Sequence, residues 1–367
     1  MTSFTVADHT YMTLALRLAE QGLYSTQPNP RVGCVIVKNN QIIGQGAHLK
    51  AGEPHAEVFA LREAGASAKE ADAYVTLEPC NHQGRTPPCV DALIIAGIKR
   101  IVVAMQDPNP LVAGKGIQRL QAHGIEVKLG LMEAEANALN PGFISRMTRG
   151  LPYVRSKVAA SLDGSTALNN GQSQWITSDA ARQDVQHWRA QSCAILTGIG
   201  SVLADNPSMN VRLPDLLRQP LRVVVDSKLQ IPLDAKILQG GNTLIAYANG
   251  LQHRSNGLQA AGASLLQVAG DEGKVCLKSL LSHLASLGIN EVMVEAGGRL
   301  NGALLAQNLI DELLIYYAPK LMGSQSKGMF ALPTLIDMRQ AIDLQLLDIR
   351  QIGKDIRLRA KPIQTAD

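Results

Sequence analysis

Aromatic side chains are scarce in this chain of 367 residues, where they make up 4% of the total. Surfaces that stack single-stranded nucleic acid depend on such side chains, so their scarcity argues against an open polynucleotide-binding surface. A clear excess of one charge is also lacking, because 35 basic and 31 acidic residues leave a formal net charge of +4. So small an excess does not indicate a polyanionic partner, and we expect no nucleic acid among its partners.

Long apolar runs and a secretion signal are missing as well. No apolar stretch reaches the ~18 residues that a membrane-spanning helix needs, so we expect no membrane partner. The first residues, MTSFTVADHT, show neither the basic start nor the apolar core of a signal peptide. Cysteine is limited to five residues, an odd number. We therefore expect reduced thiols, some of them metal ligands, and a cytoplasmic location.

The composition that remains is that of a globular protein, with 46% hydrophobic and 18% charged residues. At ~100–200 residues per domain, the length predicts two domains. The segment PGFISRMTRGLP, residues 141–152, concentrates proline, glycine and arginine. We place the boundary there, which gives domains of residues 1–147 and 148–367.

Both domains show the alternating patterns of an α/β fold. In the first, we expect a helix capped by Asp8 and a strand pair around Asn39-Asn40, followed by alternating helices and strands. The second begins with a strand in PYVRSKVAASLDG and closes with a hairpin in LQLLDIRQIGKDIRLRA. Each order predicts a sheet covered by helices.

The strongest chemical signal is His-Ala-Glu at residues 55–57, followed by two Pro-Cys pairs. Catalytic zinc keeps three protein ligands and one position for water, and His55, Cys80 and Cys89 supply imidazole and thiolate ligands. Glu57 is not needed as a ligand and can move a proton between zinc-bound water and a leaving group. This pattern predicts hydrolytic removal of ammonia from an amidine-like ring carbon.

Three other interpretations stay open at this point. The metal site would be closed and structural if His82 were a fourth ligand, although Glu57 would then have no task. A second interpretation is a nucleic-acid or free-nucleoside deaminase that is followed by an unrelated domain. The cysteine spacing argues against it, because eight residues separate Cys80 from Cys89, whereas nucleic-acid editing deaminases have C-x-x-C. The second half would be a non-catalytic module if its glycine-rich turn were only a fold feature. That turn, at Gly297-Gly298 between a strand and a helix, allows backbone N–H groups to bind a phosphate. Such turns are also common in α/β domains that bind no phosphate.

Longer motifs closely resemble the bifunctional riboflavin-biosynthesis deaminase/reductase family. In the first half these are PNPRVG (28–33), GEPHAE (52–57), YVTLEPCNHQGRTPPC (74–89) and QDPNP (106–110). In the second half they include KVAASLDG (157–164), LADNPSMNVR (203–212) and VEAGGRLNGALL (294–305). The resemblance implies an α/β protein with an N-terminal cytidine-deaminase-like three-layer domain and a C-terminal dihydrofolate-reductase-like domain.

The resemblance also implies the reactions. The first domain would use zinc to deaminate 2,5-diamino-6-ribosylamino-4(3H)-pyrimidinone 5′-phosphate, a small phosphorylated pyrimidine. The second would use NADPH to reduce the ribosyl group to ribityl, giving 5-amino-6-ribitylaminouracil 5′-phosphate. We further expect one zinc ion per chain and a homo-oligomer, either a dimer or a tetramer.

Site residues follow from the same resemblance. In the first domain, the implied substrate contacts are Asn29, His48, Arg85 and Asn109. In the second, the implied NADPH contacts are Ala159, Trp175, Ser201, Asp205, Ser227, Gly297, Gly298, Arg299, Leu300, Asn301, Gly302 and Ala303. The implied substrate contacts there are Ser173, Arg189, Met209, Arg212 and Glu295. Lys157 and Asp205 are both candidates for polarising the ribose, and Cys34, Cys193 and Cys276 are expected to be buried or inert.

Overall fold

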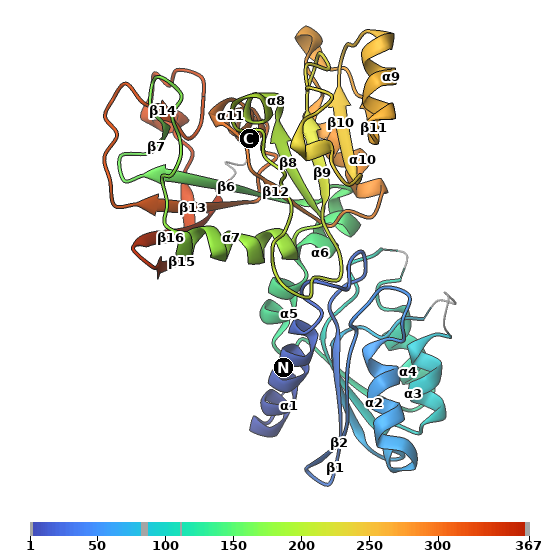
Figure 1. Cartoon of the computed structure of the whole chain (residues 1–367). Coiled ribbons are helices and arrows are strands. Elements are labelled where there is room, and N and C mark those ends of the chain that lie inside the picture. The colour runs from blue at the N-terminus through green and yellow to red at the C-terminus, as the bar shows by residue number, and fades with distance from the viewer. Residues whose placement is uncertain (1–2, 82–86, 111, 364–367) are drawn as a thin grey trace. The chain divides into compact units, whose positions relative to one another are not determined.

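The computed structural model describes residues 3–81, 87–110 and 112–363. It divides into two compact units, residues 1–151 and 152–367 (Figure 1). The division falls after Leu151, whereas the sequence analysis placed it after residue 147. Helix α6 (Pro141–Arg149) occupies most of the segment 141–152 in which the boundary was predicted. Pro141 starts this helix, at a position where its missing N–H costs nothing, and Gly150 ends it.

The first unit is a sheet with helices on both faces. Its elements are α1 (Val6–Glu20), β1 (Gly33–Lys38), β2 (Gln41–Ala47), α2 (Ala56–Ala64), β3 (Asp72–Leu77), α3 (Cys89–Ile95), β4 (Arg100–Met105), α4 (Lys115–Ala122), β5 (Glu126–Leu129), α5 (Glu133–Leu139) and α6. Among the described residues, five strands pair in the order β2-β1-β3-β4-β5. Helices α1 and α5 cover one face, and α2, α3 and α4 cover the other (Figure 1). The predicted three-layer α/β domain is confirmed.

The start of α1 differs from the prediction. Thr5, not Asp8, caps the helix, since the Thr5 side chain accepts the Asp8 N–H and the Asp8 carboxylate accepts the Thr5 N–H. This reciprocal pair is a capping box, in which the acidic residue stands three positions after the cap. The other Asp8 oxygen accepts hydrogen bonds from the Tyr74 hydroxyl at 2.7 Å and from Arg100. Asp8 is therefore a buried link between α1 and the sheet.

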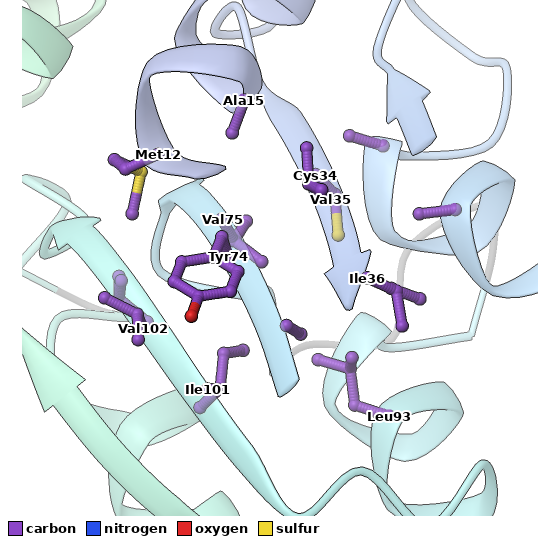
Figure 2. Packing of buried hydrophobic residues seen from close by; sticks show 14 of the residues in the cluster. Met12, Ala15, Cys34, Val35, Ile36, Tyr74, Val75, Leu93, Ile101 and Val102 are labelled. Carbon is purple, nitrogen blue, oxygen red and sulfur yellow. The ribbon is translucent and has the colours of Figure 1, made fainter. Parts of the chain in front are cut away.

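Small residues let the helices lie close to the sheet of the first unit. Figure 2 shows Met12 and Ala15 of α1 over Tyr74, with Leu93 of α3 near Ile36. At Gly46 of β2, a Cβ atom would lie only 2.0 Å from the carbonyl oxygen of Ala56, at the start of α2. The first turn of α2 therefore rests directly on the strand backbone.

The second unit is built on a mainly parallel sheet. Its elements are β6 (Tyr153–Ser161), β7 (Ser165–Ala167), α7 (Asp179–Gln191), β8 (Ala194–Gly198), α8 (Ile199–Asp205), β9 (Leu221–Val225), β10 (Thr243–Tyr247), α9 (Gln252–Ala260), β11 (Ala263–Gln267), α10 (Leu277–Ser286), β12 (Glu291–Val294), α11 (Gly298–Ala306), β13 (Glu312–Ala318), β14 (Lys327–Gly328), β15 (Leu344–Ile352) and β16 (Asp355–Pro362). Within the described chain, the main sheet has the order β11-β10-β9-β8-β12-β6-β13-β16-β15. The strands from β11 to β13 are parallel, and the predicted closing hairpin β15–β16 adds the antiparallel edge.

The closing hairpin also holds helix α7. The Asp355 carboxylate accepts both the backbone N–H and the hydroxyl of Ser178, the N-cap of α7. At the other end of the helix, the guanidinium groups of Arg155, Arg357 and Arg359 lie 4.7–5.5 Å from the Trp188 ring. In the described part of the chain, no helix combines the length and the apolar character needed to cross a membrane.

Candidate active sites

Three potential zinc ligands meet at one edge of the first sheet. His55 is the N-cap of α2, Cys89 opens α3, and Cys80 follows the end of β3. The His55 Nδ1 atom lies 3.2 Å from the Cys89 sulfur and 3.5 Å from the Cys80 sulfur. Bond lengths of ~2.0 Å to nitrogen and ~2.3 Å to sulfur place tetrahedral ligand atoms about 3.5 Å apart, so these residues fit one zinc ion. Among the described residues, no other histidine, cysteine or carboxylate joins this group.

The Cys80 thiol is prepared for binding a metal. A hydrogen bond with the Cys89 side chain lowers the pKa of Cys80 most, and hydrogen bonds with His55 and the Cys89 backbone N–H lower it further against the opposing effect of burial. Thiolate, rather than thiol, is the form that binds zinc. Of the other thiols, Cys34 and Cys193 are buried as expected, whereas Cys276 is only half-buried.

Glu57 lies beside the three ligands and is almost fully buried, with 3% of its surface exposed. Burial and the nearby Cys80 raise the pKa of Glu57 to about 7. Its Oε2 atom has no hydrogen-bond partner among the described residues. A buried carboxyl group whose oxygen is unpartnered is suited to exchanging a proton with a bound molecule.

A cavity of about 380 Å³ opens onto these residues. His55, Glu57 and Cys80 line it, together with three of the four predicted substrate contacts, Asn29, His48 and Asn109. The fourth predicted contact, Arg85, and the alternative zinc ligand His82 lie outside the described residues. The structure therefore brings Asn29, His48 and Asn109 to the candidate zinc site.

Sequence reasoning missed several residues of this cavity. Glu78, Asp107, Phe143 and Met147 line it, and two of them, Phe143 and Met147, come from α6. The signal for Glu78 was present in the sequence, since it stands between a buried strand and Pro79-Cys80. The contribution of α6 carried no such signal, because that segment was interpreted only as the place of the domain boundary.

In the second unit, a cluster of charged side chains surrounds Glu295, which follows the carboxyl end of β12. Glu295 accepts hydrogen bonds from Arg189 of α7 at 2.5 and 3.0 Å, and Lys157 of β6 lies 3.8 Å away. Burial opposes ionisation of Glu295, but the charges of Arg189 and Lys157 prevail and lower its pKa to about 2. Arg189 also contacts the Met209 sulfur and donates to the Asn210 carbonyl. Three of the five predicted substrate contacts, Arg189, Met209 and Glu295, are thus one cluster.

The other predicted residues of this unit are more dispersed. Arg212 is exposed, and its backbone N–H donates to Gln186. Ser173 is half-buried. Trp175 is exposed, and the Arg182 guanidinium lies 4.5 Å from its ring. Asp205 accepts a hydrogen bond from Gln174, next to Trp175.

Predicted NADPH contacts follow the carboxyl ends of adjacent parallel strands. Ser227 follows β9, Ser201 lies in α8 after β8, and the 297–303 turn follows β12, while Ala159 lies in β6. These four strands are neighbours in the sheet, so the residues share one edge. Within the turn, the backbone of Gly297 is open, and Arg299 is exposed.

Part of the 297–303 turn packs against other segments of the same unit and is not open to a ligand. A Cβ at Gly302 would lie 2.3 Å from the Ala331 carbonyl oxygen, and one at Gly298 would lie 2.8 Å from that of Gly328. The Asn301 side chain is buried and hydrogen-bonded to Ser156 and to the Ala296 carbonyl. Leu300 packs toward Gly198, and Ala303 is half-buried. Gly297 and Arg299 are therefore the most accessible parts of the turn.

Comparisons with known proteins agree on both units. The family described as "Cytidine and deoxycytidylate deaminase zinc-binding region" matches residues 5–105, and the "RibD C-terminal domain" matches residues 152–358. The riboflavin biosynthesis protein RibD of Escherichia coli K12 is 50% identical over 96% of this chain and 98% of its own length. The chain belongs to the RibD family. RibD of Bacillus amyloliquefaciens is 48% identical over 96% of the chain and 95% of its own length.

Solved RibD structures extend the agreement to the whole fold. Acinetobacter baumannii RibD has a TM-score of 0.91 at 49% identity, covering 98% of this chain and 99% of that one. The Thermotoga maritima protein, a diaminohydroxyphosphoribosylaminopyrimidine deaminase/5-amino-6-(5-phosphoribosylamino)uracil reductase, has a TM-score of 0.86 at 31% identity over 97% of this chain and 99% of that one.

Membership of the RibD family makes the chain a bifunctional enzyme of riboflavin biosynthesis, with a zinc-binding deaminase domain and a reductase domain. The predicted family, fold class and function are thereby confirmed. The alternatives of an unrelated second domain and of a non-catalytic second half are wrong, because the RibD reductase domain fills residues 152–358.

Proposed function

We propose that the first unit binds one zinc ion through His55, Cys80 and Cys89 and deaminates 2,5-diamino-6-ribosylamino-4(3H)-pyrimidinone 5′-phosphate. When bound, zinc supplies an acidified water for attack on the amino-substituted ring carbon. Glu57 takes the proton and returns it to the departing ammonia. The observation that carries this proposal is the meeting of three ligand atoms beside the buried carboxyl group of Glu57, whose Oε2 has no partner within the described part of the chain.

His48 and Asn29 orient the pyrimidine in this proposal. The Nδ1 atom of His48 faces the Pro54 carbonyl at 3.1 Å, and only a protonated Nδ1 can bond to a carbonyl oxygen. Burial lowers the pKa of His48, so the ring is neutral and its Nε2 accepts the Asn29 amide N–H at 3.1 Å. This chain of hydrogen bonds fixes the orientation of the Asn29 amide, whose oxygen would accept from a ring substituent. Asn109 lines the same cavity, and we assign Arg85 to the ribose phosphate by resemblance.

We propose that the second unit uses NADPH to reduce the ribosyl group to ribityl. In this proposal Ala159, Trp175, Ser201, Asp205, Ser227 and the 297–303 turn bind the cofactor, and Ser173, Arg189, Met209, Arg212 and Glu295 bind the substrate. NADPH supplies the hydride, so the protein's task is alignment. Burial lowers the pKa of Lys157, which favours this lysine over the exposed Asp205 as the group that polarises the ribose.

Two wider features belong to the same proposal. We assign a homo-oligomeric state, since the edge strand β15 exposes Leu344, Leu346 and Ile349. We assign a cytoplasmic location, since all five cysteines are free thiols.

The proposal is tested by incubating the zinc-loaded protein with the diaminopyrimidinone ribotide, with and without NADPH. Ammonia release is expected in both samples, and NADPH consumption only in the second. Ammonia release from cytidine in place of the ribotide would identify a free-nucleoside deaminase instead. NADPH consumption without ammonia release would separate the two activities and overturn their order.

A further inference from the structure

Glu78 is a buried carboxylate next to the zinc site that has no role in the chemistry described above. It follows the last residue of β3, and only 4% of its surface is exposed. Its Oε1 accepts the backbone N–H groups of Gly116 at 2.9 Å and Ile117 at 3.3 Å. Its Oε2 accepts those of Gly114 at 2.9 Å and Asp107 at 3.2 Å. Four donors from another part of the chain thus converge on one side chain.

These donors belong to the segment that carries Asn109 to the cavity. The segment leaves β4 at Met105, and its last donors are the first N–H groups of α4. Asn109 and Val112 lie between the donors and line the cavity. The Glu78 backbone N–H donates to the Met105 carbonyl at 2.9 Å, so Glu78 holds the segment where it leaves β4 and where it enters α4. A carboxylate that accepts several N–H groups forms stronger hydrogen bonds than a neutral acceptor.

A second set of contacts joins the same segment to the zinc ligand Cys80. A Cβ at Gly116 would lie 2.3 Å from the carbonyl oxygen of Pro79, so the start of α4 rests on the residue before Cys80. The Asn81 side chain donates to the Lys115 carbonyl and accepts from Arg119. The residues on both sides of Cys80 are therefore fastened to α4, and Glu78 is the charged centre of this arrangement.

We propose that Glu78 is a positioning residue for deamination, which acts by holding Asn109 at a fixed distance from the zinc ligands and Glu57. Both of its carboxylate oxygens accept backbone N–H groups of the segment that carries Asn109, so we assign it no part in the chemical step. Because Asn109 is itself a proposed substrate contact, this role rests on the deaminase function proposed above. The role is specific to the first unit, so the reductase reaction of the same chain provides an internal control.

The test is the Glu78→Gln variant of the full-length, zinc-loaded enzyme. Glutamine keeps the size of the side chain but turns one acceptor oxygen into an NH₂ group, which faces two of the four donors without being able to accept from them. We expect KM for the ribotide in deamination to rise about tenfold, and more than kcat falls, as for the loss of a binding interaction. Zinc content and the reductase kcat/KM stay at wild-type values. The matched control is Glu20→Gln, an exposed glutamate at the end of α1, which leaves all four quantities unchanged.

The double variant Glu78→Gln/Asn109→Ala separates positioning from a general structural effect. If Glu78 acts through Asn109, the double variant is no worse than Asn109→Ala alone. Additive effects, an unchanged KM, or a loss of zinc in step with activity would each overturn the proposal. If Glu78→Gln fails to fold, Glu78→Asp, which keeps the charge but shortens the side chain, is judged by the same criteria. A zinc-loaded wild-type enzyme that releases no ammonia would overturn the deaminase function itself, independently of the variants.

Discussion

Replacing Glu295 by glutamine probes the charged cluster of the reductase unit. In the wild type, this carboxylate lies between Arg189 and Lys157, with 10% of its side chain exposed. The Glu295→Gln substitution keeps the shape of the side chain but removes its charge. Arg189 and Lys157, with 13% and 18% of their side chains exposed, then lose the carboxylate that pairs with them, and breaking a largely buried ion pair in this way is destabilising.

The size of the effect follows from the pKa of Glu295, which falls from its ordinary 4.5 to about 2 in the folded protein. A difference of this size corresponds to about 3 kcal/mol of stability. Because the folded pKa is depressed, this stability is present above pH 4.5 and is lost as the pH falls toward 2. Glu295→Gln should therefore cost about 3 kcal/mol at pH 7 and progressively less below pH 4.5.

Tryptophan fluorescence during urea unfolding reports this unit alone, because the chain has two tryptophans and both Trp175 and Trp188 lie in the second unit. The matched control is Glu272→Gln. That glutamate pairs with Lys274 at the surface, where both side chains are about three-quarters exposed, so the change should leave the stability of the unit nearly unchanged. Equal stability of Glu295→Gln and wild type at pH 7, or a loss that does not shrink in acid, would refute the reasoning.

Three further predictions concern the deaminase unit. Glu57→Ala should lower the rate of ammonia release by about 10²–10⁴-fold while leaving NADPH-dependent reduction of the deaminated intermediate intact, and full deaminase activity would refute its assignment. A chelator should abolish ammonia release only, whereas parallel loss of both activities would indicate a structural metal. Gly46→Ala places a Cβ 2.0 Å from the Ala56 carbonyl oxygen and should cost about 1–3 kcal/mol in the thermal unfolding of this unit, together with weaker zinc retention in dialysis. Unchanged zinc retention in this variant would show that the start of α2 is free to move.

The sequence was most informative where chemistry restricts the choice of residue. Few residue types bind zinc, so the sequence predicted a ligand set of His55, Cys80 and Cys89. In the structure, the ligand atoms of these three residues lie within 4.8 Å of one another. The strand–helix order was equally readable, since buried strands and helices differ in their hydrophobic period.

The features that could not be predicted from the sequence are those that depend on which residues are in contact in the folded protein. The position of Glu78 before Pro79-Cys80 is visible in the sequence, but its hydrogen-bond donors come from residues nearly 30 to 40 positions later, so no local pattern reveals these contacts. The segment 141–152 was interpreted only as a domain boundary, because the prolines and glycines at the two ends of α6 are also typical of a boundary. Asp8 was misassigned as a cap because Thr5 and Asp8 are both capping residues, and only the bonded pair shows which one begins the helix.

The contacts between the closing hairpin and α7 bear on how the chain is made. Helix α7 carries Arg189, but its N-cap is bonded to Asp355 and its Trp188 ring is enclosed by Arg357 and Arg359 of β16. Asp355 is synthesised 177 residues after Ser178, so α7 leaves the ribosome long before these partners do. The deaminase unit is complete by residue 151 and can fold during translation, as N-terminal domains generally do. The reductase unit has to wait until β16 has been synthesised, so a chain that stops before β16 contains at most the first of the two enzymes.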